Sequence, residues 1–146
     1  MGKNVILEEE VEARNFERGG EVSSRLKTLL TRLNIDPDII RRSSIITYEL
    51  EMNIIIHSRG GKIVVSVEKD RLQIAARDEG PGIEDVDRAL RPGFTTADQD
   101  VRELGFGAGM GLNNVDKYSD DLKIHSDEGT KVHSTVFLSR EDEENG

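Results

Sequence analysis

The chain has 146 residues, of which 35% are hydrophobic and 34% charged, so we expect one compact domain whose apolar residues gather on particular faces. Lysine and arginine number 20 against 29 aspartates and glutamates, and the formal charge of −9 disfavours direct binding to nucleic acid or an anionic membrane. No cysteine is present, which excludes disulfides, thiol nucleophiles and cysteine metal sites, and the three histidines are too dispersed for a zinc site.

Targeting signals are not evident in the sequence. The first residues lack the long apolar stretch of a secretory signal, and no run of about 18 uncharged apolar residues could span a bilayer. We therefore expect a cytoplasmic protein with no membrane partner. A single domain is expected over residues 1–138, followed by an acidic, disordered tail over residues 139–146.

A strand and two helices are predicted in the first part of the chain. Residues 5–11 are typical of a strand, and three consecutive glutamates within it indicate an exposed sheet edge. Over residues 21–34, apolar residues that include Leu33 recur at three- and four-residue steps, which predicts an amphipathic helix. Asp36 is the expected N-cap of a longer helix that ends near His57 and has a proline in its first turn.

The rest of the chain is predicted to be mainly strands. Four strands are expected at 62–68, 72–77, 122–126 and 131–138, the last two around a turn at Glu128-Gly129. Short helices are expected at 84–90 and 112–118, and residues 91–108 are typical of a mobile loop. Helices that precede an antiparallel run of strands predict an α+β fold in two layers.

Polar residues on the long predicted helix form a stripe among apolar neighbours. Glu49, Asn53 and His57 follow one another at four-residue steps and so share one helix face. Burying a carboxylate and an amide costs several kcal/mol unless a polar group meets them, and a hydrated metal ion with phosphates would do so. The alternative is a wet helix edge at which these side chains pair with two nearby arginines.

The segment Asp78-Glu79-Gly80-Pro81-Gly82 follows a predicted strand. Counting by twos from Leu72 places the Asp78 carboxylate on the buried side of that strand, where a charge is costly. A ligand with an amino donor, such as adenine, would satisfy it, and the glycines would let the base approach the backbone. An ordinary turn after a strand is the alternative.

Alternate glycines run from Gly105 to Gly111, and Leu112 opens a predicted helix directly after them. Backbone N–H groups in such a loop, together with the partial positive charge of a helix N-terminus, can bind a di- or triphosphate. The segment is not a Walker loop, because no Lys-Ser or Lys-Thr follows it. It is not a Rossmann fingerprint either, because no buried strand precedes it. A flexible hinge is the alternative.

The order of these motifs carries a resemblance. Four motifs follow one another along the chain: a helical Glu-xxx-Asn, an Asp-x-Gly-x-Gly that ends a strand, a loop that leads into Gly-x-Gly-x-Gly, and Gly129-Thr130 at a strand start. Over residues 20–138 this resembles the ATP-binding fold of the GHKL superfamily, a two-layer sandwich with helices on one face of a mixed, mostly antiparallel sheet. The short length and the Gly-Phe-Thr-Thr before the glycines are most similar to bacterial anti-sigma regulatory factors, which are serine/threonine kinases.

The resemblance implies a role for each matched residue. Asn53 would hold Mg²⁺, Glu49 would act as general base or orient the attacking hydroxyl, and Asp78 would bind the adenine amino group. Thr130 would support Asp78 through its hydroxyl or a bridging water, and Arg102 would stabilise charge on the γ-phosphate. Further nucleotide contacts would come from His57, Gly80, Gly82, Gly105, Gly107, Gly109, Met110, Gly111 and Leu112.

By the same resemblance, we expect an ATP- and Mg²⁺-dependent serine/threonine protein kinase that phosphorylates a serine on a small antagonist (anti-anti-sigma) protein, with sequestration of a sigma factor as a second role. A nucleotide-gated binding module without efficient phosphoryl transfer is the alternative, and a housekeeping ATPase is a third interpretation. No helix pair with a phosphoacceptor histidine precedes the ATP motifs, so autophosphorylation is not expected. The N-terminal strand and first helix are expected to offer a surface for a homodimer or another partner.

Overall fold

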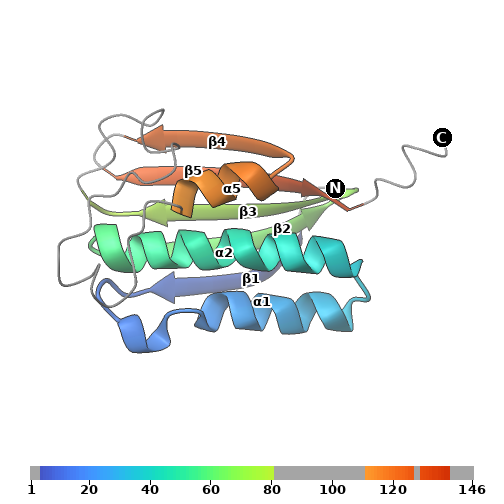
Figure 1. Cartoon of the computed structure of the whole chain (residues 1–146), viewed down its shortest axis with the longest axis horizontal. Helices are drawn as coiled ribbons and strands as arrows, with labels where there is room; N and C mark the ends of the chain where they lie inside the picture. Colours follow the sequence, from blue (N-terminus) through green and yellow to red (C-terminus); the bar gives the residue numbers. More distant parts are fainter. Residues whose placement is uncertain (1–3, 81–110, 127–128, 139–146) are drawn as a thin grey trace.

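A computed structural model describes residues 4–80, 111–126 and 129–138, which form a five-stranded sheet and its covering helices (Figure 1). The elements are β1 (Asn4–Val11), a 3₁₀ turn η1 (Phe16–Arg18), α1 (Glu21–Arg32), α2 (Pro37–His57), β2 (Gly61–Glu68), β3 (Arg71–Asp78), α5 (Gly111–Tyr118), β4 (Asp121–Ser126) and β5 (Thr130–Phe137). Every strand and helix predicted within these ranges is confirmed, whereas η1 was not predicted. The predicted helix at 84–90, the loop at 91–108 and the tail at 139–146 lie outside the described residues.

The strands follow the order β1-β2-β3-β5-β4, and each neighbouring pair is antiparallel, so the described sheet is antiparallel throughout where the resemblance implied a mixed, mostly antiparallel one. β1 forms one edge of the sheet, as its glutamates predicted, and β4 forms the other. Asn4 lies opposite Val67, and Arg71 lies opposite Phe137, next to the turn between β2 and β3. The start of β1 and the end of β5 therefore lie at the same end of the sheet, away from the end of β3.

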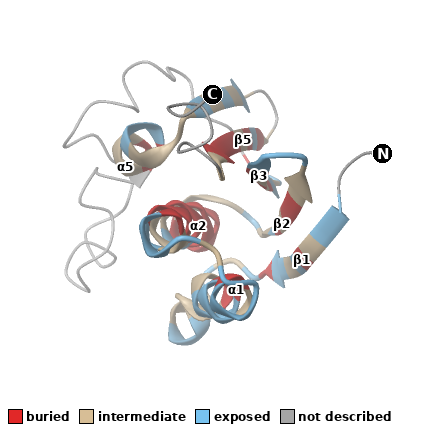
Figure 2. Ribbon diagram, turned by 90° about the vertical axis from the view of Figure 1, so that its right-hand side faces the viewer, coloured by how far each residue is buried: buried red, intermediate tan, exposed pale blue. Residues whose placement is uncertain are grey.

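Helices α1, α2 and α5 lie side by side on one face of the sheet, with α2 in the middle (Figures 1 and 2). The interface between helices and sheet is the core, and its large side chains have no more than 1% exposed surface: Leu26, Leu30, Ile46, Leu50, Ile54, Ile63, Leu72 and Ile74. This arrangement confirms the predicted two-layer α+β sandwich. No helix among the described residues is long and apolar enough to cross a membrane.

The ends of α1 and α2 follow from local sequence. The Asp36 carboxylate accepts a hydrogen bond from the Asp38 N–H at 2.9 Å, and Pro37 occupies the first position of α2, where its missing N–H is not needed. Leu33, which was predicted to lie on the apolar face of the first helix, is 52% exposed. That expectation was wrong: α1 ends at Arg32, and Leu33 is its C-cap residue at the exposed end of the helix.

Arg42 on α2 fixes the far end of α5. Its Nε and Nη2 donate to the carbonyl oxygen of Tyr118, the last residue of α5, at 3.1 and 2.8 Å. Its Nη2 also lies 3.2 Å from an oxygen of Asp120, and both side chains are at least nine-tenths buried. The carbonyl groups of the last helical turn have no partner within their own helix, so Arg42 caps α5 from a neighbouring helix.

Candidate functional site

Residues from four elements meet at one end of the molecule. The C-terminal end of α2, the end of β3, the start of β5 and the start of α5 all lie at the left-hand end in Figure 1. The polar stripe of α2, Glu49, Asn53 and His57, runs toward this end, and Asp78 and Thr130 stand on the strands beneath it. The fold therefore brings the polar stripe of α2 and the end of β3 to the same end of the molecule.

Glu49 is half-buried and faces α5. Its Oε2 accepts a hydrogen bond from Nδ2 of Asn114 at 2.6 Å. Such a contact holds a carboxylate in one orientation, as is required of a general base that accepts a proton from an attacking hydroxyl. The contact from Asn114 was not predicted from the sequence. The only signal for it was the place of Asn114 beside the buried Val115 on a short amphipathic helix. The donor to Glu49 is thus an asparagine, which does not support the alternative in which Glu49 pairs with an arginine at a helix edge.

Asn53 and His57 continue the stripe, and both are half-buried. Each four-residue step advances about 6 Å along the helix, so Asn53 lies between Glu49 and the helix end. Burial lowers the pKa of His57, and the nearby positive charge of Arg14 lowers it further. The imidazole is therefore held in its neutral form at neutral pH.

The oxygen atoms of Glu49 and Asn53 suit a hard cation. Among the described residues, no group of three or more histidine, cysteine, aspartate and glutamate side chains is arranged to hold a metal ion. Mg²⁺ commonly takes only one or two protein ligands and completes its shell with phosphates and water. The residues present thus fit a Mg²⁺ ion delivered with a nucleotide and do not fit a stand-alone metal centre.

Asp78 ends β3 and keeps its carboxylate on the helical side of the sheet, as the strand alternation predicted. Its Oδ1 accepts a hydrogen bond from the backbone N–H of Thr130 at 3.0 Å. Burial raises the pKa of Asp78, and this hydrogen bond opposes the rise. Within the described ranges no donor is bonded to Oδ2, so that oxygen can accept from a ligand.

The support from Thr130 differs from the expected form. The residue is 4% exposed, and its backbone N–H, rather than its hydroxyl, contacts Asp78. The hydroxyl lies 3.3 Å from the Ser126 hydroxyl across the β4–β5 pair. The difference arises because β5 begins at Thr130, whose N–H is not used in the strand ladder and points at the end of β3.

Two glycines allow the backbones around Asp78 to approach closely. A Cβ on Gly61 would collide with the Arg77 carbonyl oxygen, and one on Gly129 would collide with the Asp78 carbonyl oxygen. Glu79 is then bonded to the segment after α2: its N–H donates to the Gly60 carbonyl at 2.9 Å, and its carbonyl accepts from the Arg59 N–H at 2.7 Å. The Asp78 carboxylate is thereby fixed relative to α2.

The remaining predicted contacts divide into two groups. Gly80 is buried against Ser58, and Gly111 is the first residue of α5. Leu112 is 7% exposed and belongs to the hydrophobic core, so its side chain supports the site from beneath instead of lining it. The other predicted residues lie outside the described residues: Gly82, Arg102, Gly105, Gly107, Gly109 and Met110.

A second buried carboxylate, Glu51, faces away from this site. Two residues along a helix correspond to about 200°, so Glu51 points to α1 while Glu49 points to α5. Glu51 is 2% exposed and accepts hydrogen bonds from the N–H groups of Val22 and Ser23 at 3.2 and 3.4 Å. It caps α1, whose own N-cap residue, Gly20, has no side chain. Sequence reasoning missed this role.

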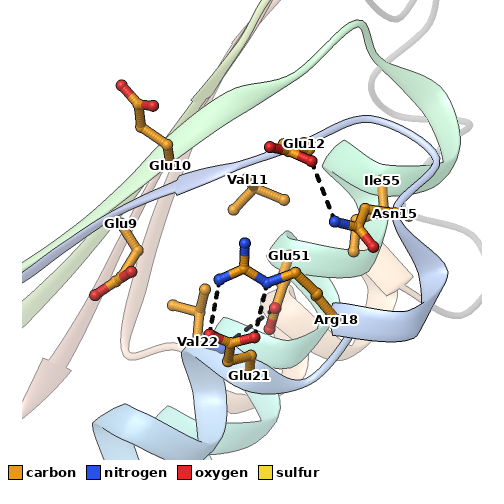
Figure 3. Close-up of a pocket in the computed structure, with 10 residues that line it drawn as sticks. All are labelled: Glu9, Glu10, Val11, Glu12, Asn15, Arg18, Glu21, Val22, Glu51 and Ile55. Atoms are coloured by element: carbon orange, nitrogen blue, oxygen red, sulfur yellow. Dashed lines mark hydrogen bonds and ion pairs between the residues drawn. The ribbon is translucent and has the colours of Figure 1, made fainter.

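Glu51 lies at the base of a pocket between β1 and the start of α1 (Figure 3). The pocket is lined by Glu9, Glu10, Val11, Glu12, Asn15, Arg18, Glu21, Val22, Glu51 and Ile55. The lining has five carboxylates and, among the described residues, one cation, Arg18, which is paired with Glu21 at 2.8 Å. Glu9 is paired with Arg25, which is not part of the lining. This negative surface repels phosphate, and the pocket is not a nucleotide site.

The stability of the protein should report the ionisation of Glu51. Burial raises the pKa of Glu51, so the folded state holds its proton to higher pH than the unfolded state, whose pKa is about 4.3. Stability then falls as pH rises from the unfolded to the folded pKa. The stability advantage of the wild type over Glu51→Gln is therefore expected to shrink across that window, by about 1.4 kcal/mol per unit of pKa difference. Urea unfolding at several pH values measures it.

The exposed Glu17 offers a matched change for this experiment. Glu17→Gln is expected to alter stability by no more than about 0.5 kcal/mol at each pH. A wild-type advantage over Glu51→Gln that instead grew with pH would show that the hydrogen bonds from α1 outweigh burial.

Comparisons with known proteins agree on one family. The family described as "Histidine kinase-, DNA gyrase B-, and HSP90-like ATPase" matches residues 40–141. The anti-sigma F factor of Caldanaerobacter subterraneus subsp. tengcongensis is 34% identical over 115 residues, which are 73% of this chain and 77% of that protein. The anti-sigma F factor of Thermoanaerobacter pseudethanolicus is 33% identical over 135 residues, 85% of this chain and 91% of its own length.

Solved structures share the fold at low sequence identity. The SiaB–SiaC complex from Pseudomonas aeruginosa matches with a TM-score of 0.59 and 13% identity over 90% of this chain and 91% of that chain. The RsbU and RsbW domains of a Mycobacterium tuberculosis protein match with a TM-score of 0.60 and 13% identity over 90% of this chain. The match spans 32% of that longer chain.

Proposed function

The chain belongs to the histidine kinase-, DNA gyrase B- and HSP90-like ATPase family and is related to anti-sigma F factors, and on this premise we propose that it is an ATP- and Mg²⁺-dependent serine/threonine protein kinase. Its proposed substrate is a serine on a small antagonist protein. A cytoplasmic location, where ATP is available, is part of the proposal. The observation that carries it is the convergence of Glu49, Asn53 and Asp78 at one end of the fold. Asp78 is half-buried, and no donor among the described residues is bonded to its Oδ2.

In this proposal Asp78 accepts a hydrogen bond from the adenine amino group through Oδ2, while the Thr130 N–H holds Oδ1. Asn53 supplies an amide oxygen for Mg²⁺, which when bound neutralises charge on the phosphates. Glu49 accepts the proton of the attacking serine hydroxyl, and Asn114 orients its carboxylate. Each of these groups is carried by a helix or at a strand end, which keeps the site rigid.

We also propose the sequence-derived contacts to the phosphates. Arg102 is assigned to the γ-phosphate, where a guanidinium stabilises the charge that spreads over the transferring group. The remaining nucleotide contacts are assigned to His57, Gly80, Gly82, Gly105, Gly107, Gly109, Met110, Gly111 and Leu112. Of these, Leu112 acts through packing, in keeping with its place in the core.

The proposed partners are an antagonist protein and a sigma factor. The names of the related anti-sigma F factors and the solved complex of SiaB with SiaC support a protein that acts on or binds other proteins. The outer edge of β1 is the surface proposed for a homodimer. β1 pairs only with β2 among the described strands, and its residue Val5 is 52% exposed.

Thermal unfolding with and without Mg·ADP tests the nucleotide site. A ligand at about 100 times its Kd stabilises the folded state by about 2.7 kcal/mol, which raises Tm by about 5–11 °C in a domain of this size. Asp78→Asn is expected to abolish this rise, because its amide presents a donor to the adenine amino group. The asparagine carbonyl can still accept from the Thr130 N–H, so the variant keeps its fold.

Asp121→Asn is the matched control, since Asp121 is an exposed aspartate on β4. It is expected to keep the full nucleotide-dependent rise. If the wild type shows no rise in Tm at millimolar Mg·ADP or Mg·ATP, the nucleotide site is refuted and the kinase proposal fails with it.

A further inference from the structure

One face of the sheet carries no helix among the described residues (Figure 2). Side chains alternate across each strand, and the buried Ile63, Leu72 and Ile74 point to the helical layer. The residues that alternate with these along each strand point to the opposite face.

Cations gather on this opposite face over β2, β3, β5 and β4. The strand register places Lys62 opposite Arg77, Arg77 opposite Lys131, and Lys131 opposite His125. Lys123 lies on the same face of β4, two residues before His125. Neighbouring strands are about 4.8 Å apart, so this row crosses the sheet within a short distance. It does so on a chain whose formal charge is −9.

Among the described residues, most of these cations have no neutralising partner. Lys62 is paired with Glu8 at 3.0 Å, but Arg77, Lys123 and Lys131 form no ion pair with any residue in the ranges that the structure describes. All three side chains are exposed. Like charges placed directly opposite each other in a sheet are destabilising, and Arg77 and Lys131 form such a pair. An anion bound over them would relieve this repulsion.

We propose that Arg77, Lys123 and Lys131, called here the basic face, bind an acidic segment of a partner protein. Charge complementarity selects the chemistry of the partner. A short acidic segment contacts the basic face alone, whereas a long nucleic acid or a membrane would also meet the acidic remainder of the protein and be repelled.

The basic face and the candidate nucleotide site lie back to back. Arg77 directly precedes Asp78 on β3, and Lys131 directly follows Thr130 on β5, so each strand end presents a cation on one side and a site residue on the other. A partner on the basic face therefore leaves the helical side open. The inference goes beyond the proposed kinase activity and does not depend on it.

Fluorescence anisotropy of a labelled peptide of alternating aspartate and glutamate, titrated with the full chain at low salt, tests the proposal. We expect saturable binding that the triple variant Arg77→Glu, Lys123→Glu, Lys131→Glu weakens by about tenfold or more, equal to at least 1.4 kcal/mol. A peptide of asparagine and glutamine is expected not to bind.

The matched control is the triple variant Lys27→Glu, Arg32→Glu, Lys117→Glu, which changes the same total charge at exposed helical positions. It is expected to bind the acidic peptide nearly as well as the wild type does. Equal loss in both triple variants would overturn the proposal, because the attraction would then be a general effect of net charge.

Two further measurements keep the test decisive. Lys131→Glu places opposite charges across the strand pair with Arg77, so its Tm is expected to be no lower than that of the wild type while its peptide binding is weaker. The triple variant of the basic face is expected to keep the nucleotide-dependent rise in Tm of the wild type, and this result separates the present proposal from the kinase proposal. A wild type that lacks the rise refutes only the kinase.

Other occupants give different outcomes. Tighter binding of oligothymidylate than of the acidic peptide would assign the face to nucleic acid and overturn the proposal. Peptide binding that is seen only after Glu141, Asp142, Glu143 and Glu144 are all changed to glutamine or asparagine would assign the face to the chain's own tail, and would overturn it as well.

Discussion

Replacing Glu49 with glutamine is expected to lower the rate of phosphoryl transfer by about 10²- to 10⁴-fold and to leave the nucleotide-dependent rise in Tm in place. Glutamine has nearly the shape of glutamate but cannot accept a proton from a hydroxyl at neutral pH. Adenine recognition depends in our proposal on Asp78, at the end of β3, so nucleotide binding is retained. The measurement is transfer of radiolabelled phosphate from ATP to the antagonist protein, or to water when no acceptor is present.

The neighbouring Asn114 provides a graded version of the same experiment. Asn114→Ala removes the hydrogen bond that orients Glu49 but keeps its carboxylate, so the loss of rate is expected to be smaller, about tenfold. Asp116→Asn, an exposed change on the same helix, is the control and should transfer phosphate at the wild-type rate.

The result also separates the kinase from a nucleotide-gated switch. A switch would show partner binding that depends on nucleotide, no phosphoryl transfer in the wild type, and no effect of Glu49→Gln on partner binding. Wild-type transfer that survives Glu49→Gln unchanged would contradict the role of Glu49 as general base.

Arg42→Ala is expected to lower the free energy of unfolding by about 3–5 kcal/mol. The change leaves the Asp120 carboxylate, whose side chain is 5% exposed, without its 3.2 Å ion pair. It also leaves the Tyr118 carbonyl at the end of α5 without two hydrogen bonds. The expected loss approaches the total stability of many small domains, so urea unfolding midpoints should reveal it clearly.

Arg41 is the matched control for Arg42. It is the adjacent residue on the same helix, and its pair with Asp38 at 2.9 Å is exposed, with more than half of each side chain accessible to solvent. Arg41→Ala is expected to cost less than about 1 kcal/mol, because surface ion pairs contribute little. Adding Asp120→Asn to Arg42→Ala should recover part of the loss, since it removes the uncompensated charge. Equal effects of Arg41→Ala and Arg42→Ala would contradict the capping role.

Local signals in the sequence predicted most of the fold. The pair Asp36-Pro37 determines where α2 begins, and the alternation around Ile74 indicates the buried side of β3, because both depend on residues close along the chain. The same alternation put the Asp78 carboxylate on the helical side correctly.

Contacts between distant elements could not be predicted in this way. Glu51 caps α1 from 29 residues away, Asn114 contacts Glu49 across 65 residues, and Arg42 binds Tyr118 across 76 residues. Each contact depends on how helices pack on the sheet, which periodicity does not encode. The same reason explains Leu112, whose helix turns it into the core, and Thr130, whose strand register presents its N–H to Asp78.

The start of β1 and the end of β5 lie at the end of the sheet remote from Asp78, and this has a practical consequence for work with the protein. An affinity tag or a fluorescent protein joined directly to Asn4 or directly to Leu138 is attached at the end away from the candidate nucleotide site. Immobilisation through a tag at either of these two positions therefore leaves the nucleotide end of the fold facing the solution.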